Sequence, residues 1–176
     1  MRTTKIMAWT EEWEISYKKE EKLLKEVFKD ELIDIFHIGS TSIPTVGYAK
    51  PIIDILIVVK DIEKINLFNN EMSSLGYQPR GENGIVERRY FSKGIDNRTH
   101  HLHIYEVGNK HIKSHLEFKE FLINNPLEAK KYGELKISLA KQFSNDHYKY
   151  QDGKQQFVNE LAIKAKIWSL QGRSTY

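Results

Sequence analysis

His37-Ile38-Gly39-Ser40-Thr41-Ser42 and, a short spacer later, Ile52-Ile53-Asp54-Ile55-Leu56-Ile57 are the two stretches that decide the fold of this chain. A Gly-Ser turn precedes an apolar strand that carries a single carboxylate. Gly39 has no Cβ, so the backbone can come close to a ligand there. Backbone N–H groups and hydroxyl groups of such a turn can hold phosphate oxygens. The sequence therefore predicts a phosphate-binding turn made by Gly39, Ser40, Thr41 and Ser42.

The strand that follows the turn contains one acid in an apolar run. Asp54 is the only charged residue between Lys50 and Lys60. A buried charge without a partner is costly, so a metal ion, an arginine or a lysine is expected beside it. The alternative is a structural role, in which Asp54 pairs with arginine or with backbone N–H groups. The residues leave both interpretations open.

Hydrophobic periodicity and turn residues predict the order of the elements. The expected helices are 10–32, with Thr10 as the N-cap, then 61–75, 111–124, 126–143 and 151–168. The expected strands are 33–38, 51–59, 85–91 and 99–107. This order predicts an α+β fold in which a mixed β-sheet is flanked by helices and followed by a helical C-terminal part. A single domain over residues 1–176 is expected at this length.

Histidines and acids on the later strands are further candidates for the site. On a strand His101 and His103 point to one face and His100 to the other. The pair could bind a transition metal, stack on a base or contact a phosphate, or it could simply be satisfied by neighbouring carbonyl groups. If their strand lies beside that of Asp54, the three side chains could form one metal site. The other acids that could serve the site are Glu82, in the turn 80–84, and Glu87 and Glu106, of which Glu82 is preferred; the alternative for all three is a solvated position on the surface.

The chain resembles the GrpB family, a branch of the nucleotidyltransferase superfamily, in motifs that extend along nearly its whole length. These are the Gly-Ser turn, Lys50-Pro51-Ile52-Ile53-Asp54-Ile55, Leu75-Gly76-Tyr77, Arg80-Gly81-Glu82-Asn83-Gly84-Ile85, Arg88-Arg89-Tyr90-Phe91, Arg98-Thr99-His100-His101-Leu102-His103, Phe118-Lys119-Glu120-Phe121-Leu122, Tyr132-Gly133-Glu134-Leu135-Lys136, and Lys154 before Phe157-Val158. The resemblance implies a nucleotidyltransferase-like fold, with Lys50, Arg89 and Lys154 near an anionic ligand. In that superfamily two carboxylates on one strand, two residues apart, hold Mg²⁺. Here the second position is Leu56, which cannot bind a metal.

Three functions remain open at this point. The first is metal-dependent transfer of a nucleotidyl group to a small-molecule acceptor, with Asp54 and Glu82 catalytic and Mg²⁺ or Mn²⁺ as cofactor. The second is a nucleotide- or phosphate-binding module without transfer chemistry, which Leu56 favours. The third is a metal-dependent phosphoesterase in which Asp54, His101 and His103 bind the ion, Zn²⁺ included. The expected partner in each case is a nucleotide or another phosphorylated small molecule.

Composition narrows the setting of the protein. The 27 basic and 24 acidic residues nearly balance, so general nucleic-acid binding is not expected. There is no cysteine, which fits a reducing compartment. The charged stretch Met1–Lys22 lacks the apolar core of a signal peptide, and no apolar run reaches the length of a membrane helix. We therefore expect a cytoplasmic protein.

Overall fold

The computed structural model describes residues 5–176, and their packing divides the chain into two compact units. Unit 2 consists of Glu11–Gly39 and Ile52–Ile112, and unit 1 of the N-terminal residues up to Thr10, Ser40–Pro51 and Lys113–Tyr176. The single domain expected over residues 1–176 stays a prediction. Its first four residues, like the start of the stretch Met1–Lys22, lie outside the described part.

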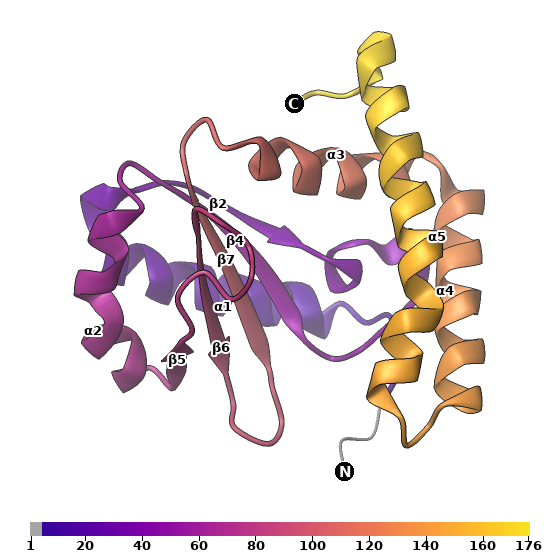
Figure 1. Cartoon of the computed structure of the whole chain (residues 1–176), viewed down its shortest axis with the longest axis horizontal. Helices are drawn as coiled ribbons and strands as arrows, with labels where there is room; N and C mark the ends of the chain where they lie inside the picture. Colours follow the sequence, from indigo (N-terminus) through magenta and orange to yellow (C-terminus); the bar gives the residue numbers. More distant parts are fainter. Residues whose placement is uncertain (1–4) are drawn as a thin grey trace. The chain divides into compact units, whose positions relative to one another are not determined.

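Unit 2 is built on a five-stranded sheet (Figure 1). Its helical elements are α1 Glu12–Phe28, η1 Lys29–Glu31, η4 Glu63–Phe68 and α2 Asn69–Ser74. Its strands are β2 Leu32–Ile38, β4 Ile53–Val59, β5 Tyr77–Pro79, β6 Arg88–Lys93 and β7 His100–Glu106. The strand order is β2-β4-β7-β6-β5, with β4 and β7 parallel and every other pair antiparallel. The predicted mixed sheet is thus confirmed. Its centre is the parallel pair that carries Asp54 and the histidines.

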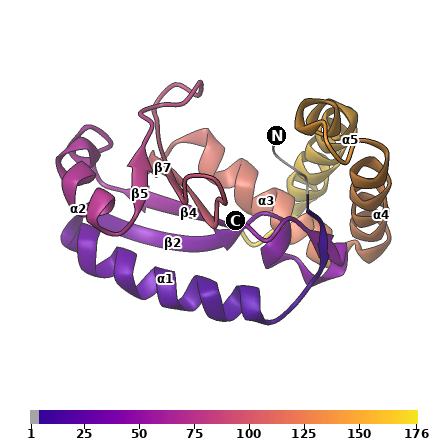
Figure 2. The ribbon, with the colours of Figure 1, turned by 90° about the horizontal axis from the view of Figure 1, so that it is seen from below.

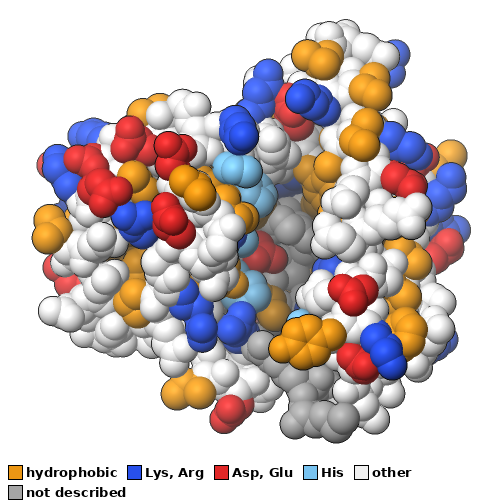
Figure 3. All heavy atoms as spheres, viewed as in Figure 1, with side chains coloured by type: hydrophobic (Ala, Val, Ile, Leu, Met, Phe, Trp, Pro, Cys, Tyr) orange, Lys and Arg blue, Asp and Glu red, His pale blue; other side chains and the backbone are white. Residues whose placement is uncertain are grey.

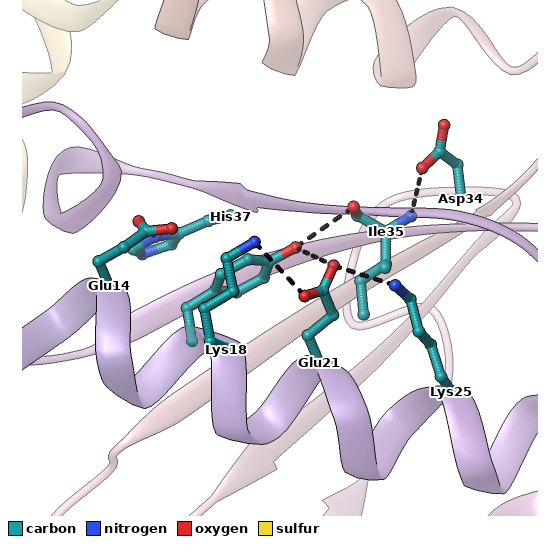
Figure 4. Close-up of polar contacts among 8 residues, drawn as sticks. Glu14, Lys18, Glu21, Lys25, Asp34, Ile35 and His37 are labelled. Carbon is teal, nitrogen blue, oxygen red and sulfur yellow. Dashed lines mark hydrogen bonds and ion pairs between the residues drawn. The ribbon is translucent and has the colours of Figure 1, made fainter.

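Helix α1 covers one face of this sheet (Figure 2). Its apolar stripe buries Trp13, Tyr17, Leu24 and Phe28, as the helical spacing predicts. Polar contacts add to this packing, as Figure 4 shows for α1 and β2. Glu14 Oε2 lies 3.2 Å from Nδ1 of the buried His37, whose ring stacks on Tyr17. Successive residues of a strand face opposite sides of the sheet. Asp54 and the side chains around it therefore lie on the face that points away from α1.

A buried acid on α1 ties the helix to the far strands of the sheet. Glu20 is only 5% exposed, and its Oε1 accepts hydrogen bonds from Tyr77 Oη at 2.6 Å and Lys93 Nζ at 2.9 Å. His100 Nε2 lies 3.8 Å from its other carboxylate oxygen. Burial alone would raise the pKa of Glu20, but the hydrogen bonds from Tyr77 and Lys93 hold it below its usual value.

Glu20→Gln is expected to lower the free energy of unfolding by about 1–3 kcal/mol at pH 7, because Lys93 then loses a charged acceptor. The pKa of Glu20 is lower in the folded than in the unfolded state, so its stabilisation is present above the unfolded value and lost as the pH falls below it. Urea unfolding of wild type and variant should therefore differ most at neutral pH, and the difference should shrink in acid. Glu26→Gln, on the exposed side of α1, is the control. An equal gap at both pH values would refute this assignment.

Unit 1 is mainly helical (Figure 1). It contains the short pair β1 Met7–Ala8 and β3 Tyr48–Ala49, the turns η2 Ser40–Ser42 and η3 Pro44–Val46, most of α3 Lys110–Asn124, α4 Pro126–Gln142, α5 His147–Trp168 and the terminal η5 Ser169–Arg173. Helices α4 and α5 pack side by side (Figure 2). Ile43, Val46, Phe121, Leu122, Ala129, Tyr132, Leu161, Ala165 and Trp168 form the core of this unit. The predicted helical C-terminal part is confirmed.

In unit 2, the largest boundary differences between prediction and structure concern three elements. The helix expected over 61–75 is a 3₁₀ segment, η4, followed by the short α2, because three asparagines in this stretch disfavour a continuous α-helix. The strand expected over 85–91 begins only at Arg88, since the turn before it is closed by Tyr90 N donating to Gly81 O. Helix α1 has Glu11 at its N-cap position instead of Thr10, and it ends at Phe28.

Candidate functional site

Asp54 is the only acid of the central strand β4, and it lies on the face of the sheet opposite α1. The register pairs Asp54 with His101 and Leu56 with His103 on the parallel strand β7. The Asp54 side chain is 30% exposed, so a small molecule can reach it. The strand of His101 and His103 thus lies beside that of Asp54, which is what a shared site of the three side chains requires.

Both imidazoles face the same carboxylate oxygen. His103 Nε2 lies 3.3 Å and His101 Nδ1 3.4 Å from Asp54 Oδ1. Burial alone would raise the pKa of Asp54, but contacts with His101 and His103 hold it well below its usual range. Asp54 is then ionised and can only accept hydrogen bonds, so both facing nitrogens act as donors.

Arg88 supports His103 from the neighbouring strand β6. Its Nη1 lies 3.5 Å from His103 Nδ1, the ring nitrogen that does not face Asp54. Arg88 is 6% exposed and also donates from Nε to Glu82 O at 3.1 Å and from Nη2 to Asn83 O at 2.8 Å. The turn backbone therefore holds a buried guanidinium that fixes the tautomer and orientation of His103. Arg88 is not among the site residues predicted from the sequence. Its place in the motif Arg88-Arg89-Tyr90-Phe91 is the signal that points to it.

Tyr90 packs between these groups. Its ring centroid lies 5.6 Å from that of His101 and 5.4 Å from that of His103, and the Arg88 guanidinium lies 4.9 Å from its centre. Burial, and then the negative charge of Asp54, raise the pKa of Tyr90, so its hydroxyl stays protonated at neutral pH. Tyr90 gives this face an aromatic wall.

The second ring nitrogen of His101 has a different environment from that of His103. His101 Nε2 is buried and has no hydrogen-bond partner among residues 5–176. This nitrogen is shielded from water, so a dissolved ligand cannot reach it. Asp54 is the most exposed of the three side chains.

Gly39 closes the site at the end of β2. Its φ is +70°, and a Cβ at this position would lie 2.7 Å from Asp54 Oδ2. Any other residue would therefore push against the carboxylate and adopt a strained backbone conformation. As expected, the backbone of the Gly-Ser turn comes close to another group. Within unit 2 that group is the carboxylate of Asp54.

Gly39→Ala is expected to destabilise the protein by about 2 kcal/mol, because left-handed strain is added to a collision with Asp54. Gly47→Ala is the matched control, since Gly47 has a φ of +82° and a Cβ there would meet no atom of the described chain within 4 Å. The control should lose only the strain, about 1 kcal/mol. Urea unfolding measures both, and NMR signals of the His101 and His103 rings should shift in Gly39→Ala alone. Equal losses in the two variants would contradict the close contact.

Glu82 and Arg89, both predicted for the site, have other contacts. Glu82 Oε1 accepts from Glu87 N at 2.8 Å and so supports its own turn. Arg89 donates to Asn66 Oδ1 at 2.9 Å and pairs with Glu63 Oε2 at 3.1 Å. Because Arg88 and Arg89 are adjacent on a strand, their side chains leave it on opposite faces. The catalytic role of Glu82 and the phosphate-binding role of Arg89 stay predictions.

The remaining predicted phosphate-binding residues belong to unit 1. They are Ser40, Thr41, Ser42, Lys50 and Lys154. Thr41 and Ser42 are buried in η2, and Trp9 Nε1 donates to the Thr41 carbonyl. Ser40 Oγ accepts a hydrogen bond from Lys136 Nζ, a residue that sequence reasoning did not select. Lys50 Nζ lies 4.5 Å and Lys154 Nζ 5.5 Å from the centre of the Tyr150 ring.

The residues beside Asp54 do not fit the magnesium pair that the resemblance implies. Mg²⁺ requires oxygen ligands, and the position of the second carboxylate is the fully buried Leu56. Asp54 Oδ1 is already in contact with two imidazole nitrogens. Within residues 5–176, no group of three or more His, Cys, Asp or Glu side chains is placed to hold a metal ion. The metal roles of Asp54, His101 and His103 therefore stay predictions.

The surface agrees with this description. On the face drawn in Figure 3, histidine side chains gather in a strip in which an acidic side chain is also visible.

Nowhere in the described chain is a helix both long and apolar enough to cross a membrane.

The mixed sheet, the single acid of its central strand and the histidines of the adjacent strand define an α+β protein with an Asp-His-His site. The family model described as "GrpB protein" matches residues 3–164, and the chain belongs to this family. The resemblance to the GrpB family is thereby confirmed.

Relatives support this assignment. The chain is 46% identical to the UPF0157 protein YqkA of Bacillus subtilis over 95% of its own length and 48% of that protein. It is 35% identical to the glutamate-rich protein GrpB of Alkalihalophilus pseudofirmus, over 89% of this chain and 92% of the relative. The crystal structure of the conserved protein GrpB from Enterococcus faecalis superposes with a TM-score of 0.88 at 38% identity, covering 93% of this chain and 99% of the other. The chain thus spans about half the length of YqkA and nearly all of the other two.

Proposed function

We propose that this protein binds a nucleotide or a related phosphorylated small molecule and transfers its nucleotidyl group to an acceptor hydroxyl. The observation that carries the proposal is the ionised, partly exposed Asp54 in contact with two imidazoles. Clusters of titratable groups with perturbed pKa values are characteristic of functional sites. The buried Arg88 beside them adds a positive charge that attracts an anionic ligand.

The chemistry follows from the exposure of Asp54. Its carboxylate, oriented by His101 and His103, accepts the proton of the acceptor hydroxyl. The acceptor oxygen forms a bond to the α-phosphorus, the bond from that phosphorus to the bridging oxygen breaks, and pyrophosphate leaves. His103, held between Arg88 and Asp54, keeps the carboxylate in place.

The second candidate is a module that binds the same ligand without transferring any group. Leu56 favours it, because the chain lacks the second carboxylate on which two-metal phosphoryl transfer depends.

The absence of cysteine supports the cytoplasm as the compartment for either function.

Ligand binding and turnover separate the two candidates. The wild-type protein is mixed with each common nucleoside triphosphate, with and without Mg²⁺, Mn²⁺ or Zn²⁺, and its melting temperature is measured. A ligand that prefers the native state raises this temperature. Stabilisation together with pyrophosphate release and a nucleotidylated acceptor supports the enzyme, whereas stabilisation without turnover supports the module. Failure of every nucleotide to stabilise the protein would refute the nucleotide as the ligand in both candidates.

A further inference from the structure

A row of polar side chains crosses the sheet of unit 2 on the face that carries Asp54. The register pairs Asp54 of β4 with His101 of β7, and His101 with Ser92 of β6. Residues that are paired directly across neighbouring strands lie on the same face of a sheet. Ser92 Oγ in turn accepts a hydrogen bond from Arg80 Nε at 2.9 Å. The row therefore begins at a carboxylate and ends at a guanidinium.

The two ends of this polar row are its most exposed groups. The Asp54 side chain is 30% exposed, and Arg80 is exposed at the end of the turn-forming segment after β5. Between them Ser92 is fully buried, and His101 Nε2 is shielded from water. A small molecule that lies across the row can therefore contact a negative group at one end and a positive group at the other.

Neutral side chains hold the guanidinium of Arg80 in place. Besides the hydrogen bond to Ser92, Nη2 donates to Gln78 Oε1 at 2.9 Å. Within residues 5–176, no carboxylate forms an ion pair with Arg80, whereas Arg89 pairs with Glu63. Two hydrogen bonds restrict the side chain and so lower the entropy that it loses when it binds a ligand. Arg80 is thus positioned in advance and keeps its full charge for an anion.

The spacing of the strands sets a lower limit on the size of a bridging molecule. Asp54 and Ser92 lie two strands apart, which corresponds to about 10 Å, and Arg80 lies beyond Ser92. A hydrogen bond at each end takes up about 3 Å. About 4 Å or more must then separate the two groups of the molecule that are bound, so these groups cannot be attached to neighbouring atoms.

We propose that Arg80 selects the acceptor, and that the acceptor is a small molecule with a hydroxyl group at one end and a carboxylate or phosphate group at the other. The hydroxyl group lies at Asp54, and Arg80 binds the anionic group. A guanidinium recognises carboxylate and phosphate through the same planar fork, so both anions share this chemistry. The reaction of the hydroxyl group rests on the proposed function, but the binding of the anionic group by Arg80 does not.

An NMR titration of the wild-type protein tests the binding step without any nucleotide. The probes are sodium 6-hydroxyhexanoate, 6-hydroxyhexyl phosphate and the neutral 1,6-hexanediol, and the signals followed are those of the Arg80 Nε–H group and the His101 ring. Both anions should shift these signals, and their binding should weaken as the salt concentration rises. The diol should bind at least tenfold more weakly. The anion that binds more tightly identifies the natural anionic group.

Chain length and charge are tested separately. Glycolate carries its hydroxyl and carboxylate groups on neighbouring carbon atoms and should bind more weakly than 6-hydroxyhexanoate. If glycolate binds as tightly, the bridging geometry is refuted. If neither long anion binds to the wild type, or if the diol binds as well as the anions, the proposal is overturned.

Arg80→Gln should weaken the binding of 6-hydroxyhexanoate by about tenfold or more, because it removes a charge-assisted contact. Arg80→Lys keeps the charge but loses the fork and should fall between this variant and the wild type. Arg173→Gln is the control, since it removes the same charge from an exposed arginine of unit 1, and it should bind like the wild type. Circular dichroism confirms that the variants are folded. Equal affinity of Arg80→Gln and Arg173→Gln would overturn the proposal.

Transfer assays separate this inference from the proposed function. If 6-hydroxyhexanoate binds through Arg80 but no acceptor receives a nucleotidyl group, the Arg80 site stands and the transfer proposal fails. If an anionic acceptor is modified and Arg80→Gln keeps the wild-type KM for it, the inference is refuted and the transfer proposal stands. The expected result for Arg80→Gln is a KM for the anionic acceptor that is raised about tenfold or more, with little change in kcat. The KM for nucleotide should stay unchanged.

Discussion

Asp54→Asn is expected to slow pyrophosphate release about a thousandfold while leaving a folded protein that still binds nucleotide. Asparagine has nearly the same shape as aspartate but lacks its charge. It therefore cannot take up the proton of the acceptor hydroxyl, nor accept with full strength from both imidazole rings. Nucleotide affinity should be unchanged or slightly higher, because a negative charge has been removed from the binding face. Single-turnover measurements of pyrophosphate release with saturating nucleotide measure the effect.

Asp34→Asn is the matched control for this variant. Asp34 lies in the same sheet, but it is exposed, and its carboxylate accepts from the backbone N–H of Ile35. Asp34→Asn should keep the wild-type rate. A rate for Asp54→Asn within threefold of this control would show that Asp54 has only a structural role.

The same variant tests the predicted metal role. If Asp54, His101 and His103 rearrange to coordinate a metal ion, equilibrium dialysis of the wild type against Mn²⁺ or Zn²⁺ should give one bound ion per chain. Asp54→Asn should then lose this ion, and Asp34→Asn should keep it. No stoichiometric binding to the wild type, or binding that survives in Asp54→Asn, would eliminate these side chains as metal ligands.

Gly133→Ala is expected to lower the free energy of unfolding by about 2 kcal/mol or more, although alanine is the better helix former. A Cβ at Gly133 would lie 2.0 Å from the carbonyl oxygen of Val46, which is too close for any real contact. The obstacle is backbone, which cannot rotate away as a side chain can. Helix α4 would have to move from η3, and the core of unit 1 would lose packing around Tyr132.

Gly153→Ala on α5 provides the comparison. A Cβ there would meet Leu139 Cδ2 at 2.6 Å, the end of a side chain that can change rotamer. Its cost should be offset in part by the gain in helix propensity, about 1 kcal/mol, so the net change should be small. Thermal and urea unfolding of the two variants measure the difference. Equal stabilities would refute the backbone contact at Gly133.

The order and type of the long elements could be read from the sequence because their patterns are local. The alternation in 99–107 placed His101 and His103 on one face, and the unbroken apolar run around Asp54 marked a central strand. The third C-terminal helix was expected from residue 151 but begins at His147, where Asp146 Oδ1 accepts from Lys149 N. Asp146, three residues before Lys149, is the sequence signal for this N-cap.

Other features depend on groups that are distant along the chain. The Glu20–Tyr77–Lys93 contact joins residues from α1, β5 and β6, and no local pattern signals it. Glu82 was selected for its carboxylate, yet the carbonyl of this residue holds Arg88 in the site. Side-chain type indicated the chemistry of the turn, but the path of the backbone determined which atom is used.

The amino-acid sequence alone determined the family, the α+β class and the identity of the acid and the histidines, because strand periodicity and motif spacing are properties of neighbouring residues. Only the tertiary structure decided that β4 and β7 are parallel neighbours, which brings two imidazoles onto one oxygen of Asp54. It also decided that Lys50 and Lys154, which are far apart in the sequence, both lie against the ring of Tyr150. The physical reason is the same in both cases: strand pairing and helix packing bring together side chains whose separation in sequence carries no information about their distance.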